Sequence, residues 1–376
     1  MALTISGVNI NGSLSAVHIP PPPPTPAYLS RWGANYSGQL GLNDTTARSS
    51  PAQVGTLTAW LGVSAGYSHC AAITTTGQLW TWGSGSAGRL GLGNTTDQSS
   101  SVQVGALTTW SSVSAGSGGY CAAITTTGQL WSWGNNGDGQ LGLGDTTNRS
   151  SPNQIGALTT WLSISAGYGQ CAAIKTDGTM WSWGNNSAGI LGLGDTTARS
   201  SPVQVGALTT WLRVSAGNYN CAAITTTGTM WTWGKNTYGN LGLGDETNRS
   251  SPVQVGALTT WSSVIVGARH CAAITTTGTL WSWGRNSLGQ LGLGDTTARS
   301  SPQQVGALTT WLRISAGYYH NAAITTTGTL WSWGQGANGQ LGLGNTTNIS
   351  SPQQVGALTA WLSVAGGGRT LAAISN

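Results

Sequence analysis

The sequence contains no phenylalanine, and only 6% of its 376 residues are charged. Ordinary soluble domains have roughly 25% charged residues. Glycine, threonine, serine and asparagine must therefore form most of the surface, a composition that suits an extracellular or particle-borne protein better than a cytosolic one. Without phenylalanine, the 20 tryptophans must supply most of the large aromatic groups of the interior.

Other absences argue against whole classes of function. The formal charge is +5, but the basic residues are scattered and form no stripe that could follow a phosphate backbone, so nucleic acid is not an expected partner. No run of about 18 apolar residues is present, and no membrane span is predicted. Met1–Ile10 lack the features of a secretory signal. We expect a virion or extracellular location, reached by lysis or inside a particle, with a cytoplasmic location as the alternative.

Catalytic and metal-binding patterns are also missing. There is no CxxC, no phosphate loop and no Ser-His-Asp order, and the few acidic residues outside a repeated connector are scattered. The five cysteines recur at one equivalent position of successive repeats. Equivalent positions in adjacent repeats normally lie further apart than the roughly 7 Å between Cα atoms that a disulfide allows, so these cysteines are expected to be small buried side chains. They are Cys70, Cys121, Cys171, Cys221 and Cys271. The sequence therefore predicts a protein that is not an enzyme, without a metal or cofactor.

The dipeptide Trp-Gly occurs seven times, at spacings of 50 or 51 residues. Its tryptophans are Trp32, Trp82, Trp133, Trp183, Trp233, Trp283 and Trp333. A fixed period near 50 residues is typical of arrays in which each unit buries its apolar face against its neighbours. The chain is therefore one unit repeated seven times.

A single unit reads as about four short strands. In the unit from 211 to 256, the segments 212–217, 221–225 and 229–234 alternate or form short apolar runs that end at glycine or a Thr-Thr-Gly turn. A glycine-rich loop and the polar connector 245–252 follow, and a last short stretch lies near 254–256. Four antiparallel strands repeated radially make the blade of a propeller.

The chain ends predict how the ring closes. The register begins at 29–33, which matches only the Trp-Gly strand, and finishes at 372–374, which matches only the preceding strand. We therefore predict an all-β fold: a seven-bladed β-propeller of four-stranded blades over residues 27–376, closed by a composite blade from N- and C-terminal strands. Residues 1–26 form a separate N-terminal arm.

The motifs resemble a known family. The segments 66–69, 70–73, 283–286 and 289–292 are similar to the repeat of the regulator-of-chromosome-condensation (RCC1-like) family, which reads roughly as Gly-x-x-His, a small apolar run, then Trp-Gly-x-Asn-x-x-Gly-Gln-Leu-Gly. The resemblance covers about residues 28 to 376 and implies a seven-bladed propeller of a bacterial or phage type. The family includes an exchange factor for a small GTPase, but that activity depends on loops that break the repeat, and this chain has none.

The connector carries an acid and a base four residues apart in five units. These pairs are Asp44 with Arg48, Asp145 with Arg149, Asp195 with Arg199, Asp245 with Arg249, and Asp295 with Arg299. In the other two units both partners change together, to Asn94 with Gln98 and to Asn345 with Ile349. Joint loss indicates a local ion pair that staples the loop, and a ring-shaped binding site is the alternative.

Two loops vary from unit to unit: the segment after Ser-Ala-Gly and the segment after Trp-Gly. Because strand direction alternates, both lie on one face, and the Thr-Thr-Gly turn lies on the other. Eight of the nine tyrosines and three of the four histidines fall in these loops, a composition typical of recognition surfaces. The candidate residues are Tyr67, His69, Tyr120, Tyr168, Tyr219, Tyr238, Arg269, His270, Arg285, Tyr318, Tyr319 and His320. A glycan, a receptor or another subunit could be the target; the alternative is that loops merely tolerate polar residues.

The N-terminal arm alternates apolar and polar residues, including Leu3, Ile5, Val8 and Ile10, and continues into a stiff polyproline segment from Pro20 to Pro24. A strand-forming tip on a rigid spacer favours docking to a protein partner, such as another virion subunit; a disordered tail is the alternative.

Together these features predict a non-enzymatic structural and recognition protein: a bacteriophage decoration or fibre component, anchored by its arm, that displays the tyrosine-rich face. A bacterial protein-interaction scaffold is the alternative, and a lectin is a third hypothesis.

Overall fold

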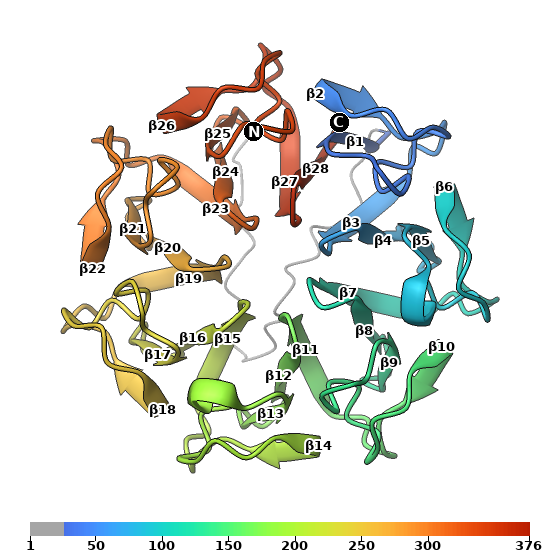
Figure 1. Ribbon diagram of the computed structural model, residues 1–376, viewed down its shortest axis with the longest axis horizontal. Helices are drawn as coiled ribbons and strands as arrows, with labels where there is room; N and C mark the ends of the chain where they lie inside the picture. The colour runs from blue at the N-terminus through green and yellow to red at the C-terminus, as the bar shows by residue number, and fades with distance from the viewer. Residues whose placement is uncertain (1–25) are drawn as a thin grey trace, which may run out of the picture.

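Each repeat folds into one four-stranded antiparallel sheet, and seven such sheets stand around a common axis (Figure 1). The computed structural model describes residues 26–376. The predicted arm, with Leu3, Ile5, Val8, Ile10, Pro20 and Pro24, lies outside the described residues. The predicted propeller fold is confirmed.

The four strands of a blade are ordered from the axis to the rim. The inner strands are β3 (Trp60–Ala65), β7 (Trp110–Gly116), β11 (Trp161–Ala166), β15 (Trp211–Ala216), β19 (Trp261–Val266), β23 (Trp311–Ala316) and β27 (Trp361–Gly366). The second strands are β4 (His69–Thr74), β8 (Tyr120–Thr125), β12 (Gln170–Lys175), β16 (Asn220–Thr225), β20 (His270–Thr275), β24 (His320–Thr325) and β28 (Thr370–Ser375).

The third strands end in Trp-Gly, and the outer strands follow the connector. The third strands are β5 (Leu79–Gly83), β9 (Leu130–Gly134), β13 (Met180–Gly184), β17 (Met230–Gly234), β21 (Leu280–Gly284), β25 (Leu330–Gly334) and β1 (Tyr28–Gly33). The outer strands are β6 (Gln98–Gln103), β10 (Arg149–Gln154), β14 (Arg199–Gln204), β18 (Arg249–Gln254), β22 (Arg299–Gln304), β26 (Ile349–Gln354) and β2 (Arg48–Gln53). Two 3₁₀ turns, η1 (Ser86–Gly88) and η2 (Ser187–Gly189), follow β5 and β13.

The hydrophobic core lies between neighbouring blades. Every residue of the second strands is buried, which explains their short, continuous apolar runs. In one interface, Trp233 packs against Trp211 with ring centroids 6.4 Å apart, and its indole N–H donates to the carbonyl of Ile190 in the preceding blade at 3.0 Å. A Cβ on Gly192 would lie 2.8 Å from that indole nitrogen. The Leu-Gly step of each unit therefore makes room for the tryptophan of the next blade.

The last blade is built from both ends of the chain. Its order is β27, β28, β1, β2, and β1 pairs with β28 from Tyr28 opposite Ser375 to Gly33 opposite Thr370. The indole N–H of Trp32 donates to the carbonyl of Gln340 in the preceding blade at 3.0 Å. The equivalent tryptophan of every other blade makes the same kind of bond to the blade before it. The predicted composite blade is thus confirmed.

The outer strand differs from the prediction. In the unit from 211 to 256 the outer strand spans Arg249–Gln254. The sequence predicted this strand near 254–256 and assigned its first residues to the polar connector. Pro252 misled the assignment, because proline interrupts a ladder. An outermost strand leaves one edge unpaired, so proline is tolerated there, and the pairing of β17 with β18 shifts register around it.

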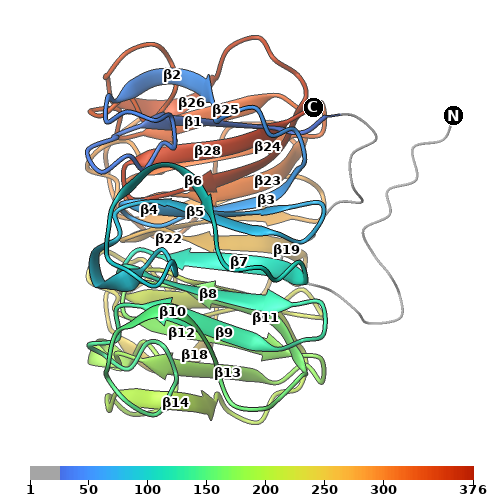
Figure 2. The ribbon, with the colours of Figure 1, turned by 90° about the vertical axis from the view of Figure 1, so that its right-hand side faces the viewer.

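The ring has two different faces. We call one the loop face: it carries the connections from inner to second strands and from third to outer strands, which touch through bonds such as Lys235 N–H to the carbonyl of Tyr219, 2.8 Å. The other, the turn face, carries the Thr-Thr-Gly turns and the links between blades, on the right in Figure 2. Ala27 and Asn376 both lie on the turn face, where their N–H groups bond Thr58 and Ala360.

Candidate functional site

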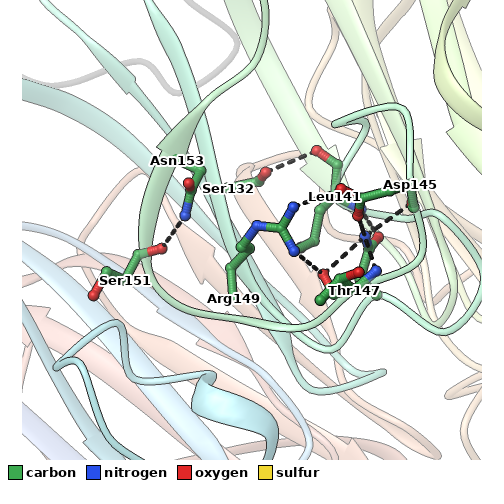
Figure 3. A network of polar contacts seen from close by, with 8 residues as sticks. Ser132, Leu141, Asp145, Thr147, Arg149, Ser151 and Asn153 are labelled. Atoms are coloured by element: carbon green, nitrogen blue, oxygen red, sulfur yellow. Dashed lines mark hydrogen bonds and ion pairs between the residues drawn. The ribbon is translucent and has the colours of Figure 1, made fainter.

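The connector pairs staple their own loops (Figure 3). Asp145 contacts Arg149 at 2.5 Å, and its other oxygen accepts from the Thr147 N–H at 2.9 Å and the Asn136 amide at 3.0 Å. The Thr147 N–H, followed by Arg149, lowers the pKa of Asp145. All five pairs have contacts of 2.5–2.7 Å. Because each carboxylate is engaged within its own connector, these pairs hold loop shape.

Four of the candidate binding residues are buried and are not exposed on the loop face. His69, Tyr120, His270 and His320 are each at most 1% exposed. They are the first residues of second strands, where the sequence placed them in a loop. They belong to a layer that we call the seam ring, whose members are His69, Tyr120, Gln170, Asn220, His270, His320 and Thr370.

The seam ring joins each blade to the next. The Tyr120 hydroxyl donates to the carbonyl of Gln170 at 2.5 Å, and Nε2 of His320 bonds the carbonyl of Thr370 at 3.3 Å. His69 contacts the sulfur of Cys121 at 3.3 Å through Nε2. Burial lowers the pKa of His69 to about 3 and those of His270 and His320 to about 4. The three imidazoles are therefore neutral packing groups at physiological pH.

The remaining candidates form a continuous row on the loop face. Arg269, from the loop between β19 and β20, lies 5.3 Å from the ring of Tyr238 and donates to its hydroxyl at 2.9 Å. Arg269 also lies 5.9 Å from the ring of Tyr219, and Lys235 lies 5.4 Å from that ring. Arg285 also lies 5.3 Å from the ring of Tyr238. Cations and aromatic rings thus alternate across blade boundaries.

The row continues past Arg285 toward the closing blade. Arg285 lies 5.0 Å from Tyr319, and Tyr319 packs edge-on against Tyr318 with centroids 4.5 Å apart. Tyr318 meets Tyr67 at 5.9 Å, and Arg369 lies 5.9 Å from Tyr67. At the opposite end, Tyr168 lies 6.3 Å from Tyr219. We call this set the cation–tyrosine arc: Tyr168, Tyr219, Lys235, Tyr238, Arg269, Arg285, Tyr319, Tyr318, Tyr67 and Arg369.

The arc is accessible and carries unneutralised positive charge. Tyr168 is 50% exposed and Tyr67 is 37% exposed. Within residues 26–376 every ion pair lies in a connector, so none involves the four cations of the arc. The nearby Asp138 accepts instead from the Asn185 amide at 3.0 Å. Cations held over aromatic faces are ordered while their charge stays available.

The arc includes eight of the twelve predicted residues, and it adds two. Lys235 and Arg369 fall in the same variable loops, and their positive charge beside the tyrosines was the signal that could have included them. The second blade, with Ser117 and Gly118 at the corresponding place, contributes none. Tyr36 is 68% exposed but bonds Asn338 at 3.0 Å and makes no contact with the arc.

No metal site or reactive thiol is formed by residues 26–376. No three potential metal ligands from His, Cys, Asp and Glu converge there. All five cysteines are buried and unpaired, and burial raises the pKa of Cys70 to about 11 and that of Cys171 to about 12. The same residues include no helix long and apolar enough to cross a bilayer.

Comparison with known proteins identifies the family. A profile described as the RCC1-like domain matches residues 29–373. The chain belongs to the RCC1-like family. Human WBSCR16 superimposes with a TM-score of 0.84 at 21% identity, over 93% of this chain and 99% of that one. Yeast RCC1 (Prp20) bound to Kap60 gives a TM-score of 0.85 at 17% identity, over 100% and 95%. At these identities the likeness establishes the fold.

Curated proteins match the chain over shorter stretches. The Arabidopsis thaliana ultraviolet-B receptor UVR8 is 34% identical over 130 residues, which are 34% of this chain and 30% of the receptor. Human protein RCC2 is 50% identical over 52 residues, 13% of this chain and 10% of that protein. These matches span less than a third of either relative. They therefore show similarity in the repeats and say nothing of the activity of the whole relatives.

Proposed function

We propose that this RCC1-like propeller is a non-catalytic interaction protein whose cation–tyrosine arc binds an acidic segment of a protein partner. The observation that carries the proposal is the continuous series of contacts between four cations, none of them in an ion pair, and six tyrosines across neighbouring blades. Tyrosine and arginine are enriched among residues that dominate binding energy. Unpaired positive charge also steers negatively charged partners into contact.

Related structures support a protein partner. Yeast Prp20 has been crystallised with Kap60, and a second Prp20p structure is described with its binding properties to Gsp1p and histones. Those partners belong to Prp20. What carries over to this chain is the use of an RCC1-like propeller as a platform for protein binding.

Charge reversal in the centre of the arc tests the proposal. In the variant R269E/R285E, binding of a fluorescent glutamate-rich peptide should fall at least tenfold at low salt, because two attractive contacts become repulsive. The matched control is T75E/T126E/T226E/T276E, which changes the net charge by the same amount on exposed turn-face positions. Fluorescence anisotropy measures both. Equal affinity of wild type and R269E/R285E, or equal loss in the control, would contradict the proposal.

The more specific role, a phage decoration or fibre protein anchored by residues 1–26, stays a prediction. It depends mainly on residues outside those the structure describes. A glycan target for the loop face also stays a prediction, and the unpaired cations favour an acidic ligand over a neutral sugar.

A further inference from the structure

The third residue of each inner strand forms a ring around the propeller axis. We call it the channel ring, and its members are Gly62, Ser112, Ser163, Arg213, Ser263, Arg313 and Ser363. All seven stand at one height, because each pairs with the isoleucine of the second strand. Five units thus have glycine or serine at a position where two have arginine.

The channel ring lies two residues along the inner strands from a central cavity. The fifth residues of the inner strands, including Ser215 and Ser315, line a central cavity of about 170 Å³ to which all seven blades contribute. Because side chains alternate along a strand, the third and fifth residues share a side. A second cavity of about 180 Å³ adjoins the ring at Gly62 and Ser112. The ring therefore lies close to the central cavity, and Gly62 and Ser112 line the second one.

Polar atoms of the ring lack partners. The hydroxyl oxygens of Ser112, Ser163, Ser263 and Ser363 are buried and make no hydrogen bond within the described part of the chain. The Nε atoms of Arg213 and Arg313 are buried and unbonded in the same way. Buried polar groups are nearly always hydrogen-bonded, so these atoms of the ring are free to bond a ligand that reaches them.

The two arginines also lack a counter-charge. None of the ion pairs within residues 26–376 involves Arg213 or Arg313, and the sequence of residues 1–25 contains no aspartate or glutamate. Desolvation lowers the pKa of both, and the positive charge of Arg213 lowers the pKa of Arg313 further. Two cations from the fourth and sixth repeats thus repel each other in a partly buried channel, an arrangement that an anion between them would reverse.

We propose that the channel ring binds a small tetrahedral oxyanion, phosphate or sulfate. Arg213 and Arg313 supply charged N–H donors from two sides, and Ser263, which stands between them in the ring, supplies a hydroxyl donor. Guanidinium groups match the oxygen spacing of such anions, and donors arriving from several blades suit a ligand with oxygens in every direction. The site is independent of the cation–tyrosine arc, since it uses other residues at another depth.

Isothermal titration with inorganic phosphate tests the site, at constant ionic strength maintained with sodium chloride. Wild-type protein should bind one phosphate per chain, and R213S/R313S, which installs the serine of the neighbouring units, should bind at least tenfold more weakly. The matched control R149Q/R199Q removes two charges from the connectors and should bind phosphate like the wild type. Sulfate should compete with phosphate, and chloride should not.

Thermal unfolding gives a second readout. Phosphate should raise the melting temperature of the wild type but not of R213S/R313S, and the variant should be the more stable protein in chloride alone because the repulsion is gone. Absence of phosphate binding to the wild type, or equal binding to R213S/R313S, overturns the proposal. If R213S/R313S does not fold, R313K replaces it: loss of the forked donor should weaken binding several-fold, and unchanged affinity overturns the proposal.

Discussion

The two faces of the ring differ in what fixes their sequence. On the turn face, a Cβ on Gly278 would lie 2.3 Å from the carbonyl oxygen of Thr309 in the neighbouring link, and the same close approach recurs in every unit with this turn, at Gly77, Gly128, Gly178, Gly228 and Gly328. On the loop face, Tyr318, Ala268 and Asn218 occupy one equivalent position. Loop-face glycines have similarly close backbone contacts, as at Gly217, where a Cβ would lie 2.6 Å from the carbonyl oxygen of Gly267, but the positions that follow these glycines change from unit to unit. Variation on the loop face is therefore free to serve binding.

The largest expected effect comes from the layer beneath the loop face. His69, His270 and His320 have native pKa values of about 3, 4 and 4, whereas an unfolded histidine has a pKa near 6.5. Below about pH 6.5 the unfolded chain takes up protons that the folded chain refuses, so the free energy of unfolding should fall as the pH drops toward 4. Each histidine contributes up to about 1.4 kcal/mol per pH unit. Urea unfolding at a series of pH values measures the slope.

The variant H69Q/H270Q/H320Q, which installs the residue found at Gln170, should show a much flatter profile between pH 6.5 and 4. Above pH 7 the two profiles should run parallel. An identical slope in wild type and variant would mean that the histidines are not held neutral.

A glycine substitution on each face should separate the two constraints. Gly278→Ala places a Cβ against Thr309 at a backbone φ of +76°, so it should cost about 1–3 kcal/mol of unfolding free energy. Gly137→Ala, on the exposed loop face, meets nothing nearer than the Asn135 side chain at 3.7 Å and should stay within about 0.5 kcal/mol. Denaturant titration compares them, and equal costs would erase the distinction between the faces.

The smallest effect is expected at the rim. The double change D245N/R249Q converts one connector to the pattern of Asn94 and Gln98. Because Asp245 is 40% exposed, the ion pair is screened by solvent, and the melting temperature should change by less than about 3 °C. Differential scanning calorimetry measures the shift, and a drop of 10 °C would show that the connectors stabilise the ring far more than exposed pairs do.

The period of Trp-Gly was enough to predict the number of blades, the strand order and the composite closure, because each step reports a packing requirement repeated in every unit. It could not place the seam ring. A residue such as His69 directly follows a glycine-containing loop, and only its pairing with Gly83 shows that it begins a strand. The outer strand was missed because a polar segment with proline carries no strand signal.

Contacts between blades were also beyond the sequence. Arg269 and Tyr238 are 31 residues apart, and only the geometry of the ring brings the end of one unit beside the first loop of the next. The exception at Arg213 and Arg313 was visible in principle, since other units have serine or glycine there. Its meaning depended on learning that these strands face a channel.

The composite blade that closes the ring also places both ends of the propeller on one face. Because Ala27 and Asn376 both sit on the turn face, a support joined at either of these two residues would lie behind the propeller, with the cation–tyrosine arc directed outward. Immobilising the propeller through residue 27 or residue 376 should therefore present the same surface to a soluble ligand. The propeller therefore presents the same face to a ligand whichever of these two residues is attached.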